Sequence, residues 1–413
     1  MKNYMGKKTM PDKDPIAILN GKIVTPIQVI EKGVLVIEDG RITDVGTEHA
    51  VKVPRRAERI DASGKILAPG FIDVHTHGAV GKTTQESYEA IDEVSKYFAK
   101  CGTTGFFSTT FGSLEEIMEG ARVAKDAIEK GLGGAQALGL HLEGPYLNPR
   151  KPGAGDPKTF RHPSIEEFEK IQQESGKAVK LVSIAPEIDG ALEFIEYVTK
   201  RGIVAAIGHS YATYEEVLAG IKAGISHVCH TYNAQRELHH REPGVVGAAL
   251  CEERLMCELI ADSYHVHPAA MKVLWRTQGT DHIDLITDST TPAGLPEGEY
   301  DFLGLKVIVK GGKCVIPRPP VSSALEGTPE AEKETLAGSM ATMNGDVRNM
   351  VKLVGVTLQD AIKMATINPA REFGFDNKGR LERGKDADVI LIDEDANIYM
   401  TIVDGKIVYR IDL

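Results

Sequence analysis

Short aliphatic runs alternate with stretches of helical spacing along the middle of the chain, from residue 71 to residue 375. The helical stretches, such as SYEAIDEVSKYFAKCG and TYEEVLAGIKAG, repeat apolar residues every three or four positions and end in glycine, as helices do. This alternation predicts an α/β fold, in which helices cover a parallel sheet. Eight candidate strands favour a (β/α)8 TIM-like barrel over a doubly wound sheet. These strands are GFIDVHTHG, TTGFFSTT, ALGLHLEGPY, VKLVSIAPE, IVAAIGHS, SHVCHTYN, CELIADSYHV and IDLITDST.

Both ends of the chain have a different alternation, with a period of two residues, which is typical of strands. Near the N-terminus, AILNGKIVTP, GVLVIEDGRITDVG and ERIDASGKILAPG contain apolar positions separated by Gly or Asp-Gly turns. The segment DADVILIDEDANIYMTIVDGKIVY near the C-terminus repeats this pattern. We therefore expect a small β-sandwich domain built from residues 1–70 plus 376–413, with a hydrolase barrel at residues 71–375 inserted between its two parts.

Composition narrows the class of protein. The 413 residues are 42% hydrophobic, which suffices for a sizeable core, and the net charge of -11 argues against nucleic acid or an anionic membrane as a partner. A small anionic substrate would need a local basic pocket. The 5 cysteines form no CxxC pair, and no apolar run approaches the length of a signal segment or a membrane span. These features predict a cytoplasmic enzyme without a disulfide framework.

Titratable side chains stand at the ends of the predicted strands, where barrel enzymes hold their catalytic groups. His75 and His77 follow the first strand two residues apart, so both side chains project from the same face of an extended backbone. A single histidine is more often a hydrogen-bonded residue than a ligand. Several imidazoles and carboxylates on one rim, however, would repel one another or stay unsatisfied without a cation. The residues that predict this metal site are His75, His77, Glu143, His209, His230 and Asp288.

This set of ligands indicates a divalent transition metal, with one or two ions per subunit. Imidazole and carboxylate suit zinc, which we place first, and also iron, manganese or cobalt. Asp288, in LITDST, is the candidate catalytic residue, because a carboxylate beside a metal can accept a proton from water and return it to a leaving amine. The alternative is that Asp288 only caps the following turn through Ser289 and Thr290.

A series of motifs in the chain resembles a known family. GFIDVHTHG, HLEGPYLNP, IGHS, CHTYNAQ, REPGVVGA, IADSYHV, TDST, LAGS and GKDADVILID, in this order, closely resemble the N-acetylglucosamine-6-phosphate deacetylases of the amidohydrolase superfamily. The first and last motifs are shared across the superfamily and indicate fold and metal chemistry, whereas HLEGPYLNP, HTYNAQ and REPGVVGA are narrower and indicate the substrate. The resemblance implies a hydrolase that converts N-acetylglucosamine 6-phosphate into glucosamine 6-phosphate and acetate in amino-sugar metabolism.

The resemblance also implies roles for individual residues. His75 and His77 would allow a second ion, with Glu143 bridging the two ions, and Asp288 would be the general base and acid that also touches a metal. Arg241 and His265 would contact the sugar phosphate, each reaching into the partner's site of a homodimer. The implied ligands of the principal metal are Glu143, His209 and His230, and the implied substrate contacts are Ala154, Asn233, Ala234, Arg241, His265, Leu336, Ala337 and Gly338.

The chemistry of arginine supports a phosphate contact independently, because its planar fork of donors matches phosphate oxygens. The alternatives are a surface ion pair between Arg241 and Glu237 or Glu242, and a hydrogen-bonded loop histidine at His265.

The chain departs from the family pattern at two places. Many members have a histidine that helps polarise the acetyl carbonyl where RKPGAGDP of this chain has Gly155. A second metal at His75 and His77 could replace that polarisation as a Lewis acid, and Asp156 is a weaker substitute. The segment 317–335, PRPPVSSALEGTPEAEKET, is also longer and richer in proline than the family pattern; it is either a solvated surface loop or a modifier of substrate choice.

Three alternative functions stay open. A deacetylase for N-acetylgalactosamine 6-phosphate would differ only in the epimer that it accepts. A cyclic-amide hydrolase would commonly use a carboxylated lysine at the end of the fourth strand, but that strand ends in VSIAPE without lysine. A catalytically dead barrel that serves as a binding protein would typically have lost metal ligands, and all the predicted ligands are present here.

Overall fold

The computed structural model of the chain describes residues 14–317 and 335–411, so almost all of the predicted 317–335 insertion lies outside the described residues. Its centre is a parallel sheet of eight strands in the order β15-β14-β13-β12-β11-β10-β9-β6. The Asp288 N–H donates to the His75 carbonyl at 2.8 Å, which joins the segment after β15 to β6, where β15 and β6 are the two outermost strands of the sheet. The predicted (β/α)8 barrel is confirmed. Its strands are β6 (Phe71–Thr76), β9 (Thr103–Thr110), β10 (Gln136–Glu143), β11 (Val179–Ile184), β12 (Val204–Ile207), β13 (His227–Val228), β14 (Met256–Leu259) and β15 (Ile283–Leu285).

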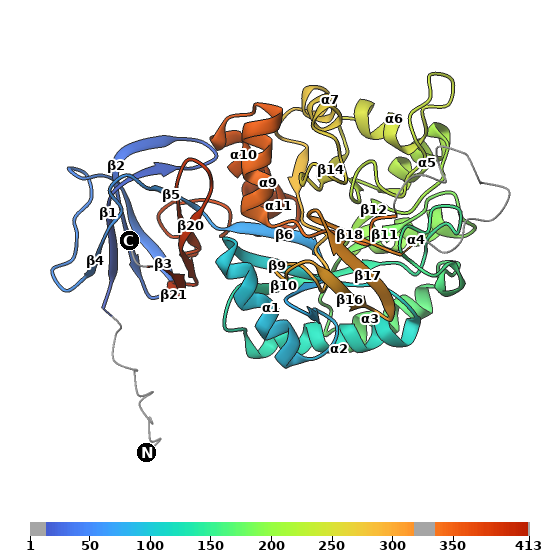
Figure 1. The fold of residues 1–413 in the computed structure, drawn as a ribbon, viewed down its shortest axis with the longest axis horizontal. Coiled ribbons are helices and arrows are strands. Elements are labelled where there is room, and N and C mark those ends of the chain that lie inside the picture. Colours follow the sequence, from blue (N-terminus) through green and yellow to red (C-terminus); the bar gives the residue numbers. More distant parts are fainter. Residues whose placement is uncertain (1–13, 318–334, 412–413) are drawn as a thin grey trace, which may run out of the picture.

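Helices surround this sheet, as Figure 1 shows. Ser113 and Thr213 begin two of them with capping boxes, in which the cap side chain and a glutamate three residues later satisfy free backbone N–H groups. Among the described helices, none is long and apolar enough to cross a bilayer. The α-helices are α1 (Tyr88–Lys100), α2 (Leu114–Lys130), α3 (Ile165–Glu174), α4 (Ala191–Thr199), α5 (Tyr214–Ala223), α6 (Gly244–Cys251), α7 (Pro268–Gln278), α9 (Met343–Asn349), α10 (Leu358–Met364) and α11 (Ile367–Glu372), with a 3-10 turn η1 (Pro157–Thr159) and a π-helical turn η2 (Met350–Val354).

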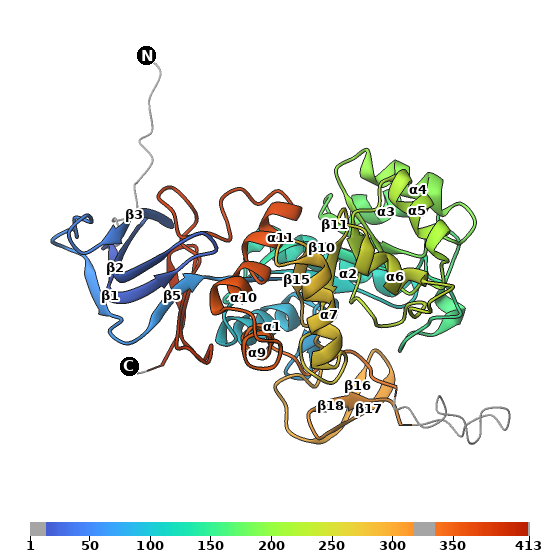
Figure 2. The same ribbon diagram turned by 90° about the horizontal axis from the view of Figure 1, so that it is seen from above.

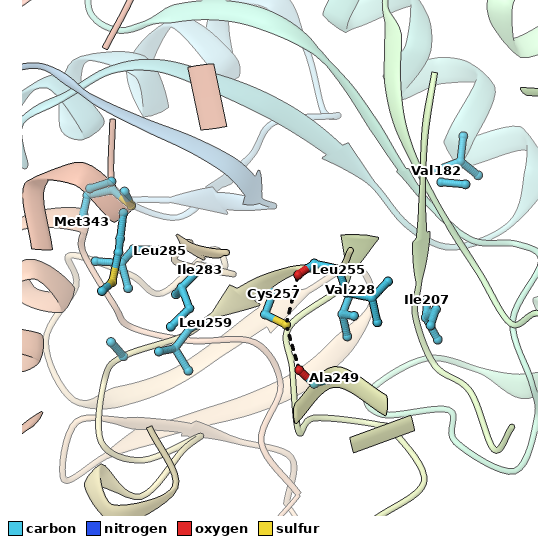
Figure 3. Packing of buried hydrophobic residues seen from close by; sticks show 14 of the residues in the cluster. Val182, Ile207, Val228, Ala249, Leu255, Cys257, Leu259, Ile283, Leu285 and Met343 are labelled. Carbon is cyan, nitrogen blue, oxygen red and sulfur yellow. Dashed lines mark hydrogen bonds between the residues drawn. The ribbon is translucent and has the colours of Figure 1, made fainter. Parts of the chain in front are cut away.

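The barrel strands divide their side chains between two apolar layers. On β14, Cys257 and Leu259 belong to the cluster shared with the helices, and Figure 3 shows them beside Val228 and Leu285. A separate cluster contains Ile72, Val74, Phe107, Leu181, Ala206, Cys229, Ile260 and Ile286. Side chains alternate between the two faces of a strand. A polar residue that stands between two outward-facing residues of β14 or of β15 therefore points into the barrel.

A second eight-stranded sheet combines the two ends of the chain, in the order β21-β20-β19-β5-β1-β2-β3 with β4 paired to β1. Figure 1 places it beside the barrel. This confirms the predicted β domain from both termini. One buried cluster includes Val24, Ile66 and Ile390 together with the barrel core, so the two parts share a hydrophobic contact. The division at residues 70 and 375 stays a prediction. The strands are β1 (Ile16–Val24), β2 (Val29–Glu38), β3 (Arg41–Thr47), β4 (Glu58–Asp61), β5 (Ile66–Pro69), β19 (Val389–Ile392), β20 (Ile398–Val403) and β21 (Lys406–Arg410).

Two small antiparallel pieces were not predicted. The strands β7 (Gly78–Ala79) and β8 (Lys82–Thr83) form a hairpin directly after β6. A three-stranded sheet of β16 (Gly298–Phe302), β17 (Leu305–Lys310) and β18 (Lys313–Val315) follows β15, and Figure 2 shows it projecting from the barrel. The alternation and glycine turns in EYDFLGLKVIVKGGKCVI were the available signal for this sheet.

Phe107 provides a test of the barrel core. Its ring is fully buried and lies 4.7 Å from the ring of Phe373, with Phe375 at 6.0 Å. We expect Phe107→Ala to lower the free energy of unfolding by about 3–5 kcal/mol, because it removes a large apolar side chain and leaves a cavity. Urea denaturation measures this loss. The control Leu192→Ala, at a side chain that is 41% exposed, should change the value by less than about 0.5 kcal/mol. Equal losses in both variants would contradict the account.

Candidate active site

A cavity of about 600 Å³ opens at the C-terminal ends of the barrel strands. Most of the predicted metal-site residues line it, while His75 is fully buried behind it. The side chains come from the C-terminal ends of β6 and β10 and from the segments that follow β6, β12, β13 and β15, so the parallel barrel brings together residues that lie far apart in sequence. The predicted residues that line the cavity are His77, Ala154, Glu143, His209, His230, Asn233, Ala234, His265, Asp288, Leu336 and Gly338.

Glu143 is the centre of this group. Its Oε1 lies 3.0 Å from His230 Nε2 and 3.1 Å from His209 Nε2, and its Oε2 lies 3.1 Å from His77 Nε2. The same Oε1 is 3.5 Å from His75 Nε2. One carboxylate is thus shared by two pairs of imidazoles.

Asp288, in the segment after β15, faces His75 and His77 of the neighbouring β6 segment. Its Oδ1 lies 3.3 Å from His77 Nε2 and 3.7 Å from His75 Nε2. The two histidines are therefore both directed at Asp288 and Glu143, as expected for side chains two residues apart on an extended segment.

The donor set fits divalent cations. The Nε2 atoms of His209 and His230 are only 3.2 Å apart, and His75 Nε2 is buried with no hydrogen-bond partner among the described residues. Converging nitrogen lone pairs and carboxylate oxygens at such distances are satisfied by a cation, and imidazole with carboxylate suits a transition metal. Cys229 also lies near, with its Sγ 3.9 Å from Glu143 Oε1. Its thiol stands further from Glu143 than any of the imidazoles, so we assign the ligands to histidine and carboxylate.

The backbone is strained where three of these side chains begin. His209, His230 and Asp288 have φ values of 45°, 26° and 48°, in the left-handed region that non-glycine residues rarely adopt. Each such residue costs on the order of 1–3 kcal/mol, and residues of this kind cluster at functional sites. The strain therefore supports a functional role for the group.

The site keeps its carboxylates charged although they are buried. Burial alone would raise the pKa of Glu143, but the charge of His75 and the hydrogen bonds with His209 and His230 hold it well below its usual value. Burial acts in the same way on the pKa of Asp288, and the hydrogen bond with His77 and the charge of His75 lower it. Asp288 is therefore an ionised carboxylate that can accept a proton.

Two of the predicted substrate contacts do not line the cavity. Arg241 is exposed, and its Nη1 lies 2.8 Å from the ring of His240. Among the described residues, the carboxylate of Glu237 pairs with Lys151 and that of Glu242 pairs with Arg236. Ala337 is fully buried behind the lining residues that flank it. The ring of His265 is held at the cavity by Asp262, with Nδ1 at 2.7 Å from Oδ2.

The structure gives a physical reason for the glycine at 155. A Cβ atom there would lie 2.6 Å from Phe111 Cζ and 3.1 Å from Phe160 Cζ, so any side chain would collide with these rings. The ring of Phe111 lines the cavity and lies 6.1 Å from the ring of His77. Phenylalanine thus occupies the space that a histidine would need.

Several lining residues were missed from the sequence. Phe302 and Lys313 come from the unpredicted three-stranded sheet, and Lys313 is the one lysine or arginine among the described lining residues. Glu258, below the cavity on β14, contacts two histidines. A carboxylate within the apolar run CELIAD was the available signal for this residue.

Comparison with known proteins agrees with this architecture. The model of the amidohydrolase family matches residues 66–408. The chain is 37% identical to an N-acetylglucosamine-6-phosphate deacetylase of Bacillus subtilis, over 94% of the chain and 95% of that protein. It is 36% identical to an N-acetylgalactosamine-6-phosphate deacetylase of Escherichia coli, over 90% of the chain and 97% of that protein. The solved structure of an N-acetylglucosamine-6-phosphate deacetylase from Thermotoga maritima superposes with a TM-score of 0.83 and 34% identity, covering 96% of this chain and 100% of that one.

Proposed function

The chain belongs to the amidohydrolase family, and we propose that it hydrolyses N-acetylglucosamine 6-phosphate to glucosamine 6-phosphate and acetate. The observation that carries the proposal is the convergence of four imidazoles and the Asp288 carboxylate around Glu143, beside a cavity large enough for a sugar phosphate. The relatives that share this architecture over most of the chain supply the substrate class.

We propose that one divalent cation binds Glu143, His209 and His230, and that a second binds His75, His77 and Asp288, with Glu143 between them. Zinc is the first candidate. Bound there, such ions would polarise the acetyl carbonyl and activate water.

Asp288 moves the proton in this proposal. Its ionised carboxylate, at the floor of the cavity, accepts a proton from the attacking water and then returns it to the amine nitrogen as the C–N bond breaks. The amine leaves as the free amino sugar, and the acyl carbon keeps the oxygen of water as acetate. The rings of Phe111 and Phe302 flank His77 at 6.1 Å and 5.7 Å and limit the access of bulk water to that side.

The phosphate needs positive charge, which Lys313 offers among the described lining residues, and the ring of His265 is a further polar contact in the cavity. Arg241 lies outside the cavity of its own chain, so we propose that Arg241 of the partner subunit completes the site in a homodimer. We expect Lys313→Ala to raise KM for the sugar phosphate about tenfold to a hundredfold with little change in kcat, because a hydrogen bond to a charged group is worth about 1.5–3 kcal/mol. Steady-state kinetics measure this. Lys310→Ala, at an exposed lysine of the same small sheet, is the control. An unchanged KM in Lys313→Ala would remove Lys313 from the site.

The epimer is tested by parallel kinetics on the two N-acetylhexosamine 6-phosphates. A relative that acts on the galacto epimer is nearly as similar to the chain as one that acts on the gluco epimer. We expect kcat/KM to be higher for N-acetylglucosamine 6-phosphate by about tenfold or more, the effect of one misplaced hydroxyl group worth about 1.4 kcal/mol. The reverse order would assign the chain to N-acetylgalactosamine 6-phosphate instead.

A further inference from the structure

Glu258 is a fully buried carboxylate that the proposed reaction does not use. Its Oε2 lies 2.9 Å from His75 Nδ1 and accepts the backbone N–H of His230 at 2.9 Å. Its Oε1 lies 3.1 Å from His227 Nε2. Three potential donors thus surround one carboxylate in the interior of the barrel.

This arrangement determines which ring nitrogen of His75 carries the proton. An ionised carboxylate can only accept hydrogen bonds. The Nδ1 of His75, which faces Glu258, therefore carries the proton of the imidazole ring. A histidine binds a metal as the neutral imidazole, and in that form the lone pair of His75 is on Nε2. That Nε2 faces Glu143 Oε1 at 3.5 Å and Asp288 Oδ1 at 3.7 Å and has no hydrogen-bond partner among the described residues.

A lone pair that is directed at two carboxylate oxygens is unfavourable unless a cation lies between them. We propose that Glu258 is a positioning residue: it holds the ring of His75 so that Nε2 is offered to the second divalent cation, and it thereby sets the affinity of that cation site. This inference rests on the proposed two-metal site.

The rings of His209 and His230, the proposed ligands of the principal cation, receive no hydrogen bond from Glu258 in the described part of the chain. The Nδ1 of His209 lies 2.9 Å from the carbonyl oxygen of Lys151, and Glu258 contacts only the backbone of His230. A loss of the Glu258 carboxylate is therefore expected to act on the second cation and to spare the first.

The neighbouring strand supplies a matched control. Asp284 pairs with Glu258 in the register of β14 and β15, is fully buried, and has no hydrogen-bond partner for either carboxylate oxygen among the described residues. Asp284→Asn therefore changes a buried carboxyl group of the same barrel layer without touching a proposed ligand.

The experiment titrates metal-free wild type, Glu258→Leu, Glu258→Gln and Asp284→Asn with cobalt(II), by calorimetry and by visible absorption, and counts ions per subunit by mass spectrometry. Wild type and Asp284→Asn should bind two ions. Glu258→Leu should bind the first cobalt ion with wild-type affinity. Its affinity for the second ion should fall about 10- to 100-fold, as it does when a hydrogen-bond partner that orients a ligand is lost. The absorption band of the second cobalt equivalent should also change. Glu258→Gln keeps an acceptor oxygen but loses the charge, so its second affinity should fall by a smaller but measurable factor, about three- to tenfold.

A folded Glu258→Leu protein with the second affinity and spectrum of wild type would overturn the proposal. If Glu258→Leu does not fold, Glu258→Gln decides, and an unchanged second affinity there would overturn it. An equal loss in Asp284→Asn would also overturn it, because the effect would then be structural. A wild type that binds a single ion would refute the two-metal site and the role of Glu258 together, whereas two ions bound with wild-type affinities in every variant would refute the role of Glu258 alone.

Discussion

Replacement of Asp288 by asparagine is expected to lower kcat for N-acetylglucosamine 6-phosphate by about 10²–10⁴-fold, the usual contribution of a positioned acid or base. Asparagine is close in size and keeps an oxygen toward His77 and His75, so the first cation should stay bound. What the variant loses is the ability to accept a proton from water and return it to the leaving amine.

The measurement is steady-state kinetics on protein whose metal content is determined in parallel. The control is Asp284→Asn, which makes the same change at a buried carboxyl group outside the cavity and should keep kcat within about twofold, as expected for a residue without a role in the transition state. Full activity of Asp288→Asn at normal metal content would remove Asp288 from the mechanism.

Replacement of Glu143 by alanine should have an effect at least as large, because Glu143 is shared by both proposed cation positions. Its oxygens lie 3.0–3.1 Å from the ring nitrogens of His230, His209 and His77. Without it these histidines lose their common partner, and we expect less than one ion per subunit. Activity should fall more than about 10³-fold, since the polarisation of the carbonyl by a metal is worth several kcal/mol.

Chelation gives the matching experiment on the wild type. Treatment with a chelator should abolish activity, and added zinc should restore it in the wild type but not in Glu143→Ala. Retention of two ions by Glu143→Ala would contradict the assigned ligands.

The sequence predicted the barrel and the terminal sheet well because both depend on local patterns. Runs such as TTGFFSTT and VKLVSI are rich in β-branched and aromatic residues, and they became β9 and β11. The strand-end rule then located His75, Glu143 and Asp288, because parallel strands bring their C-terminal ends to one face.

What the sequence did not predict depends on packing between distant segments. Phe111 lies beside Gly155 in the folded barrel although the two residues are 44 positions apart in the sequence, so no sequence pattern indicated this contact. Glu258 lies inside a strand and not at its end, so its contact with His75, 183 residues away, could not be inferred from spacing. The outward position of Arg241 likewise depends on the path of its loop.

The most direct test of the central claim is proton NMR of N-acetylglucosamine 6-phosphate incubated with zinc-loaded wild type, with the same protein after chelation, and with Asp288→Asn. We predict that the acetyl methyl signal of the sugar is replaced by the signal of free acetate, in equal amount to the glucosamine 6-phosphate formed, only with the zinc-loaded wild type. Absence of acetate from that sample, or equal release by the chelated protein, would contradict the account.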